Sequence, residues 1–176
     1  MSRLILILIL FSFTSTSYAL SAYDNASNYG GGWTNLSNNG TGFNPWGFTV
    51  DGDDIVEIAN STVGAGDINT GINSFRIASD NGGDLDVFRT FGGGASLGAG
   101  DVFSFDLSVN YRNGNKGFDL RNAGTGLFNF NVGSDNYYFG GIDLGAEGWT
   151  YVSDGAYSLE FGFVTETIMN AKITRN

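Results

Sequence analysis

The chain of 176 residues has no cysteine and no histidine, and Pro45 is its one proline. Without cysteine there is no disulfide framework, so the fold depends on packing alone. The same absences exclude zinc bound by thiolate or imidazole, Ser-His-Asp hydrolysis and cysteine nucleophiles. Basic residues are also few, with eight Lys and Arg against 18 Asp and Glu and a net charge of -10. Binding to nucleic acid through a general basic surface is therefore not expected.

The first 19 residues have the pattern of a secretory signal peptide. Arg3 supplies a positive charge, an apolar run follows over 4–13, and Ser17-Tyr18-Ala19 forms a small-x-small cleavage motif. The apolar run is shorter than the ~20 residues of a membrane-spanning helix. We expect cleavage after Ala19, secretion or display at the cell surface, and a single mature domain over 20–176. A retained N-terminal anchor is the alternative.

Aromatic residues are abundant, with 15 Phe, 8 Tyr and 3 Trp, and the 28 glycines fall mainly between apolar runs. Over 101–132, apolar and polar residues alternate with a period of two, which predicts strands with one buried face. We expect a three-stranded antiparallel meander there, with tight turns at 113–115 and 123–126. Its apolar face requires a second sheet, and further short strands are predicted on both sides of it along the chain.

The pattern as a whole predicts an all-β fold, an antiparallel two-sheet β-sandwich of jelly-roll type. Alternation places Glu160 on the water-facing side of its strand. The side chains predicted to line the core are Phe103, Phe105, Leu107, Val109, Phe118, Leu120, Phe128, Phe130, Phe161 and Phe163.

Four segments resemble a recurring module of exported bacterial proteins, mostly uncharacterised, that often carry PEP-CTERM-type sorting tails. They are YDNASNYGGGWTNLSNNGTGFNPW (23–46), GDINTGINSFRIAS (66–79), YRNGNKGFDLRN (111–122) and LFNFNVG (127–133). The resemblance implies an extracellular β-sandwich and carries no catalytic residues. The Pro-Glu-Pro, apolar and basic tail of such proteins does not occur before Asn176, which argues against surface sorting by that route.

Five aromatic side chains lie in or beside segments rich in glycine and asparagine: Trp33, Trp46, Tyr137, Tyr138 and Trp149. Tryptophan and tyrosine rings stack on sugars, and loops commonly carry binding residues. These residues are the predicted ligand site. The tandem Tyr137-Tyr138 places one ring on each face of a strand, so one of the two should be exposed. Packing of the same rings in the core is the alternative.

Two acidic turns are candidates for binding calcium, which prefers six to eight oxygen ligands. Neither turn matches the EF-hand pattern. Ordinary turn formation is the alternative, because Asp, Asn and Gly are common turn residues. The carboxylates of the candidate site are Asp51, Asp53 and Asp54 in the first turn and Asp80, Asp84 and Asp86 in the second.

The favoured function is a non-enzymatic, exported binding or adhesion protein with polysaccharide or cell-surface glycan as its partner. This interpretation requires no cofactor and leaves calcium optional. A structural envelope or matrix protein that associates with itself through exposed strand edges is the second hypothesis. An outer-membrane β-barrel and a glycosidase with two carboxylates are further alternatives.

Overall fold

The structure, a computed structural model, describes residues 21–52, 54–60, 73–79, 83–109, 114–133, 136–145, 149, 155–165 and 168–175. Within these ranges it contains eleven β-strands and two short 3-10 helices, and every strand pairing is antiparallel. The predicted all-β, antiparallel fold is therefore confirmed. No helix in this part of the chain is long and apolar enough to cross a membrane. The predicted signal peptide lies outside the described residues.

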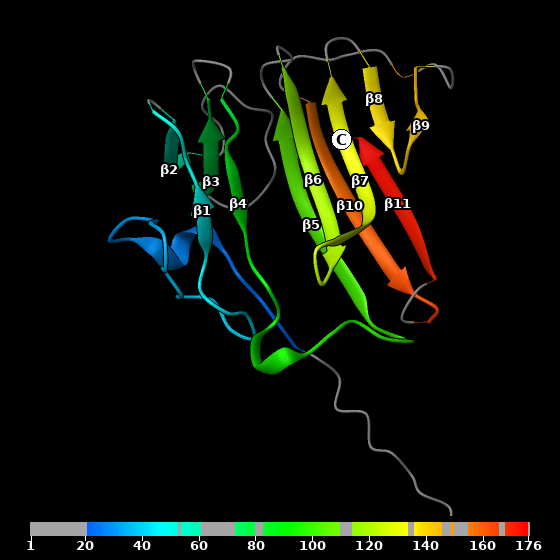
Figure 1. Ribbon diagram of the computed structural model, residues 1–176, viewed down its shortest axis with the longest axis horizontal. Helices are drawn as coiled ribbons and strands as arrows, with labels where there is room; N and C mark the ends of the chain where they lie inside the picture. Colours follow the sequence, from blue (N-terminus) through cyan, green and yellow to red (C-terminus); the bar gives the residue numbers. More distant parts are fainter. Residues whose placement is uncertain are drawn as a thin grey trace, which may run out of the picture.

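Two sheets lie face to face and form a sandwich (Figure 1). One sheet has the order β11-β10-β5 and consists of β5 (Val102–Val109), β10 (Gly155–Phe163) and β11 (Met169–Arg175). The other has the order β6-β7-β8-β9 and consists of β6 (Asn115–Asn122), β7 (Thr125–Gly133), β8 (Asn136–Phe139) and β9 (Ile142–Asp143). The alternating residues of these strands supply the two apolar faces that meet in the middle.

The core between the sheets is mainly aromatic. All ten side chains predicted to line it belong to one hydrophobic cluster, and Glu160 is exposed as predicted. Phe105 of β5 meets Phe118 of β6 with ring centroids 4.3 Å apart, and Phe128 of β7 meets Phe161 of β10 at 4.8 Å. Such ring pairs add about 0.5–1.5 kcal/mol each to the stabilisation from area burial.

The predicted three-stranded meander over 101–132 is wrong in the step from β5 to β6, which do not pair with each other. β5 pairs with β10, whereas β6 pairs with β7, so β5 and β6 lie in different sheets. Alternation shows which side chains are buried, but it does not show which strand pairs with which. Phe105 and Phe118 can be in contact either as neighbours in one sheet or across the core of a sandwich, and here they meet across the core. The meander is instead β6-β7-β8-β9. The turn at Ala123-Gly124 joins β6 to β7 with positive φ at both residues, as a two-residue hairpin requires.

The N-terminal part of the chain lies beside the sandwich, next to β5 and β6 (Figure 1). Its elements are η1 (Ala26–Tyr29), β1 (Gly47–Thr49), β2 (Ile55–Asn60), β3 (Asn73–Ala78), β4 (Asp86–Phe88) and η2 (Gly92–Gly94). β1 pairs with β4 and β2 with β3. The segment 21–46 has little regular structure. Its rings Trp33 and Trp46 pack on Phe48 and Phe75, whereas Phe43 stacks on Phe91.

Candidate functional site

The five aromatic residues predicted to bind ligand do not form one surface. Trp33 is 3% exposed and packs edge-on against Trp46 and Phe48. Tyr137 is fully buried in the sandwich and accepts a hydrogen bond of 2.6 Å from the hydroxyl of Tyr157. Burial leaves neither ring a face on which a sugar could stack, so the prediction is corrected for Trp33 and Tyr137.

Trp46 and Trp149 are half-buried, and both rings already have partners within the protein. The indole N–H of Trp46 donates to Asp24 Oδ2 at 3.1 Å, and the Arg89 guanidinium lies 5.1 Å from its ring centroid. The Arg175 guanidinium likewise lies 4.9 Å from the ring centroid of Trp149. Tyr138 lies on the opposite face of β8 from Tyr137, as expected for the tandem pair, but it is half-buried rather than exposed.

The carboxylates of the candidate calcium site are only partly within the described residues, because Asp53 and Asp80 fall outside them. Asp54 Oδ2 accepts a hydrogen bond of 2.8 Å from the backbone N–H of Asp51, a contact typical of a turn. Asp84 and Asp86 are exposed, and the described residues contain no group of three or more acidic side chains arranged to hold a metal ion. Calcium binding remains a prediction.

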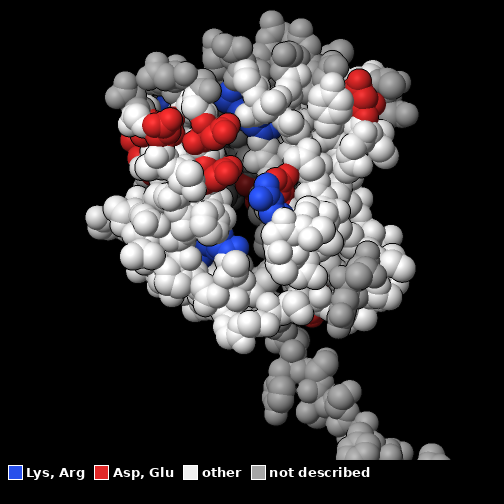
Figure 2. Space-filling view, viewed as in Figure 1, with Lys and Arg blue, Asp and Glu red and all other residues white. Residues whose placement is uncertain are grey.

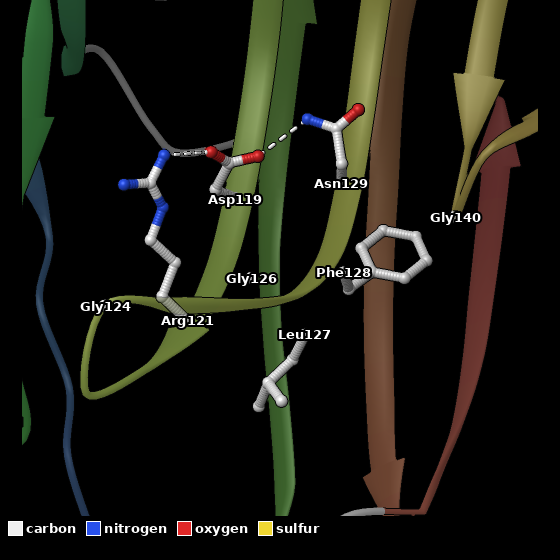
Figure 3. A pocket seen from close by; sticks show the side chains of 8 residues that line it. All are labelled: Asp119, Arg121, Gly124, Gly126, Leu127, Phe128, Asn129 and Gly140. Atoms are coloured by element: carbon white, nitrogen blue, oxygen red, sulfur yellow. Dashed lines mark hydrogen bonds and ion pairs between the residues drawn. The ribbon is translucent and has the colours of Figure 1, made fainter.

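A hollow of about 470 Å³ lies instead on the outer face of the four-stranded sheet, and we call it the Asp119 hollow. Figure 3 shows its lining, which comes from β6, β7, the turn between them and the turn after β8. The lining residues are Asp119, Arg121, Gly124, Gly126, Leu127, Phe128, Asn129 and Gly140.

The register of β6 and β7 brings the polar side chains of the Asp119 hollow together. Asp119 and Asn129 are directly opposite each other, so both side chains project from the same face of the sheet. Asn129 Nδ2 donates to Asp119 Oδ1 at 2.6 Å. Arg121 lies two residues beyond Asp119 and shares its face, and its Nη2 donates to Asp119 Oδ2 at 2.5 Å.

A register shift between Leu120 and Arg121 shapes the hollow. Leu120 pairs with Phe128 and Arg121 with Gly126, so Leu127 is an extra residue in β7. Such a bulge bends its strand and increases the local twist. A Cβ atom on Gly126 would have no heavy atom within 4 Å, which shows that the space above this glycine is open.

The charges in the hollow are compensated. Hydrogen bonds from Asn129, and then from Arg121, hold the pKa of Asp119 below its usual value. The bond to Asp119 raises the pKa of Arg121, and the negative charge of Asp86 on β4 acts in the same direction. Asp86 belongs to the N-terminal part, so the site lies where that part approaches β6. Figure 2 shows a depression between the two parts, with acidic side chains along one rim and both signs of charge on the other.

The hydrogen bonds inside the network determine which atoms remain for a ligand. Because Asn129 Nδ2 is committed to Asp119, the amide oxygen is left as an acceptor and points away from it in Figure 3. The side chain of Arg121 is 58% exposed, and its bond to Asp119 uses only Nη2. The hollow therefore offers donors and acceptors side by side, an arrangement that suits hydroxyl groups, which donate and accept at once.

A second hollow, of about 520 Å³, lies beside η1 and β2. Its charged side chain, Glu57, forms an ion pair with Arg76 on the neighbouring strand β3, and both side chains are exposed. Its aromatic residues, Tyr29 and Trp33, are buried. Among its described lining residues, the one charged group is therefore already paired with Arg76.

Comparison of the chain with known protein families, with curated proteins and with solved structures found no match. Sequence reasoning missed Asp119, Arg121 and Asn129, because their types and spacing are those of any water-facing strand. The one available signal was alternation, which places Asp119 and Arg121 on the outer face of β6.

Proposed function

We propose that this chain is a non-enzymatic, exported protein that binds extracellular carbohydrate, and that the Asp119 hollow is its ligand site. One observation carries the proposal: Asp119, Arg121 and Asn129 form a hydrogen-bonded group with unused donors and acceptors around an open hollow. Preformed groups of this kind cost little conformational entropy on binding. The site thus differs from the loop aromatics that the sequence suggested.

The charge balance favours a neutral ligand. Asp119 is compensated by Arg121, and the chain as a whole has a net charge of -10. An anionic polysaccharide would be repelled by this net charge, whereas a neutral one loses nothing to it. Hydrolysis is disfavoured, because Asp119 is the only carboxylate among the eight lining residues and glycosidases generally use two.

A pull-down with insoluble polysaccharides tests the proposal. The purified protein is mixed with cellulose, xylan, mannan, chitin and β-1,3-glucan as neutral probes, and with alginate as an anionic one. We expect binding to at least one neutral probe and none to alginate. The variant Asp119→Ala/Asn129→Ala should weaken binding roughly fivefold to 150-fold, because it removes the fixed donor-acceptor group, about 1–3 kcal/mol of hydrogen bonding.

Glu57→Gln is the matched control, because Glu57 is also an exposed carboxylate in an ion pair on a β-hairpin. It should bind as the unchanged protein does. If Glu57→Gln weakens binding and the Asp119 variant does not, the ligand occupies the second hollow. If no polysaccharide binds, carbohydrate recognition is rejected.

Self-association through a strand edge is the second candidate function, favoured by the position of β11. This strand of seven residues pairs with β10 and forms one edge of its sheet in the described part of the chain. Such edges can pair with another copy, although Lys172 and Arg175 are residue types that oppose it. Light scattering over a range of protein concentrations distinguishes self-association from carbohydrate binding. Oligomers that grow with concentration in a protein that binds no polysaccharide would support self-association through β11.

A further inference from the structure

We propose that the ligand of the Asp119 hollow extends across the depression in Figure 2, and that one of its sugar rings stacks on the side chain of Phe88. This inference rests on the proposed function and goes further, because it assigns a second contact area, on the N-terminal part of the chain. We call that area the β1–β4 face and define it as Gly47, Thr49, Asp86 and Phe88.

The register of β1 and β4 brings the four residues of this face together. Gly47 of β1 is the partner of Phe88 on β4. Thr49, two residues along β1, is the partner of Asp86 and projects from the same side of the strand pair. Phe48, between them, projects from the other side and packs on the aromatic cluster of the N-terminal part. The β1–β4 face is therefore the outer face of the pair.

The ring of Phe88 lies flat on Gly47. A Cβ atom on Gly47 would lie 2.4 Å from Cζ of Phe88, 2.5 Å from its Cε2 and 3.0 Å from its Cε1. These distances place that point above the face of the ring, because a point beyond its rim would be much farther from Cε1. An aromatic ring that covers a cross-strand glycine compensates for the missing side chain. The close approach requires glycine at position 47 and fixes the orientation of the ring.

The opposite face of the Phe88 ring is turned outward. Phe88 is 56% exposed, although phenylalanine is among the residue types most often fully buried. Since Gly47 covers one face of the ring, most of the exposed area belongs to the other face and to the ring edge. A fixed aromatic ring with one free face has the geometry in which a sugar stacks through its C–H bonds.

Asp86 connects the β1–β4 face with the Asp119 hollow. Its negative charge raises the pKa of Arg121, which lines the hollow. Because charge interactions weaken with distance, this effect indicates that the carboxylate and the guanidinium lie close together. Phe88 is on the same side of β4, two residues or roughly 7 Å from Asp86. In Figure 1, β4 is the strand of the N-terminal part nearest to β5 and β6. A glycan that leaves the hollow past Arg121 therefore meets the β1–β4 face.

The surroundings of Phe88 favour a sugar over a protein partner. Its neighbours on the face are Thr49 and Asp86, so one apolar ring stands among a hydroxyl and a carboxylate. A specific protein interface needs about 1,000 Å² or more, with an apolar centre. A sugar ring instead presents C–H bonds on its face and hydroxyl groups around its rim, which matches a single aromatic ring bordered by polar groups. The negative charge of Asp86 favours a neutral glycan over an anionic one.

The test compares variants of Phe88 in oligosaccharide binding. Isothermal titration calorimetry with cello-, xylo-, manno-, chito- and laminari-hexasaccharides first identifies the series that binds to the unmodified protein. Phe88→Leu keeps an apolar cover on Gly47 but removes the flat ring. It should lower the affinity for that hexasaccharide roughly threefold to tenfold, the loss of one aromatic contact. Phe88→Tyr keeps the ring and should retain the affinity.

Ile142→Ala is the matched control, because Ile142 is 59% exposed but lies on β9, at the opposite edge of the four-stranded sheet from β6. It should bind as the unmodified protein does, and equal losses in Ile142→Ala and Phe88→Leu would contradict stacking on Phe88. If Phe88→Leu keeps full affinity while Asp119→Ala/Asn129→Ala loses it, this inference is overturned and the proposed function stands. Absence of binding in every series overturns both.

A second readout uses the unmodified protein and so does not depend on the folding of any variant. The NMR signals of the Phe88 ring should shift when the hexasaccharide is added, because a stacked sugar changes the surroundings of its free face. The ring signals of Phe161, which is fully buried in the sandwich core, should stay in place. Unshifted Phe88 signals in a protein saturated with ligand would overturn the inference.

Discussion

Arg89 and Asp24, 65 residues apart in the chain, form an ion pair whose side chains are only 5% and 9% exposed. The same carboxylate oxygen of Asp24 accepts hydrogen bonds from the Tyr29 hydroxyl at 2.8 Å and the Trp46 indole at 3.1 Å. Arg89 Nε donates to the backbone carbonyl of Asn44 at 2.9 Å. This network joins the start of the described chain to the segment after β4.

Removing one partner of this pair should destabilise the protein strongly. Arg89→Met leaves the carboxylate of Asp24 buried without its counter-charge, which costs about 3–5 kcal/mol in comparable cases. The free energy of unfolding is measured by urea denaturation. Arg76→Met is the matched control, because its ion pair with Glu57 is exposed and should be worth less than about 1 kcal/mol. Equal losses in the two variants would contradict a structural role for the buried pair.

The core should respond to truncation according to burial. Phe161 is fully buried, so Phe161→Ala should cost about 3–5 kcal/mol of unfolding free energy. Phe105 is in the same cluster but only partly buried, so Phe105→Ala should cost less. Both are measured by urea denaturation with the unchanged protein as reference. A larger loss for Phe105 would mean that β5 carries more of the core than its exposure indicates.

Much of this fold was predictable, because alternation reports burial directly. Phe103, Phe105, Phe161 and Phe163 were assigned to the core from a period of two, and all four lie in it. The partner of each strand was not predictable in the same way. Pairing of β5 with β10 depends on contacts between residues far apart in the chain. A strand has the same alternating pattern whether the next strand along the chain pairs with it in the same sheet or lies across the core in the other sheet.

The candidate site was harder to predict than the fold. Trp33 was a reasonable choice of ligand-binding residue by type, yet its ring fills a cluster with Trp46, Phe48 and Phe75. Large aromatic side chains stabilise a core as well as they bind sugars, so type alone does not separate the roles. Asp119 and Asn129 meet only through the register of β6 and β7, which the sequence does not reveal.

Binding at the Asp119 hollow should tolerate mild acid. The pKa of Asp119 lies below its usual value because the charged form accepts hydrogen bonds from Asn129 and Arg121. A carboxyl group whose pKa is depressed contributes its stabilisation above the ordinary pKa and loses it as pH falls through the depressed one. We therefore expect affinity to stay constant from neutral pH down to the ordinary carboxyl range, near pH 4, and to fall below it.

Asn129→Ala supplies the check on this pH dependence. It removes the largest cause of the shift, so the pKa of Asp119 should rise toward its usual value. The loss of affinity in acid should then begin at a higher pH than in the unchanged protein. Carboxyl chemical shifts followed by NMR give the pKa, and calorimetry gives the affinity. An unchanged Asp119 titration in this variant would show that Asn129 does not hold the carboxylate.

Gly126 offers a way to close the Asp119 hollow without disturbing the fold. A Cβ there would meet no heavy atom within 4 Å, and the residue lies in β7 opposite Arg121. Gly126→Gln should therefore fill the hollow with its side chain and lower the affinity for polysaccharide more than tenfold. Its unfolding free energy should stay the same or rise by up to about 1 kcal/mol, because glycine is an unfavourable residue inside a strand.

Gly162→Gln is the matched control for this closure. Gly162 is also a strand glycine with open space around it, but it belongs to β10, in the other sheet. Gly162→Gln should have the same unfolding free energy as Gly126→Gln and the same polysaccharide affinity as the unchanged protein. That result would show that the loss of affinity in Gly126→Gln comes from filling the Asp119 hollow. If both glutamine variants bind as well as the unchanged protein, a filled hollow does not obstruct the ligand and the site must lie elsewhere. If both lose affinity, the ligand contacts both sheets, because the two positions share no surface within one sheet.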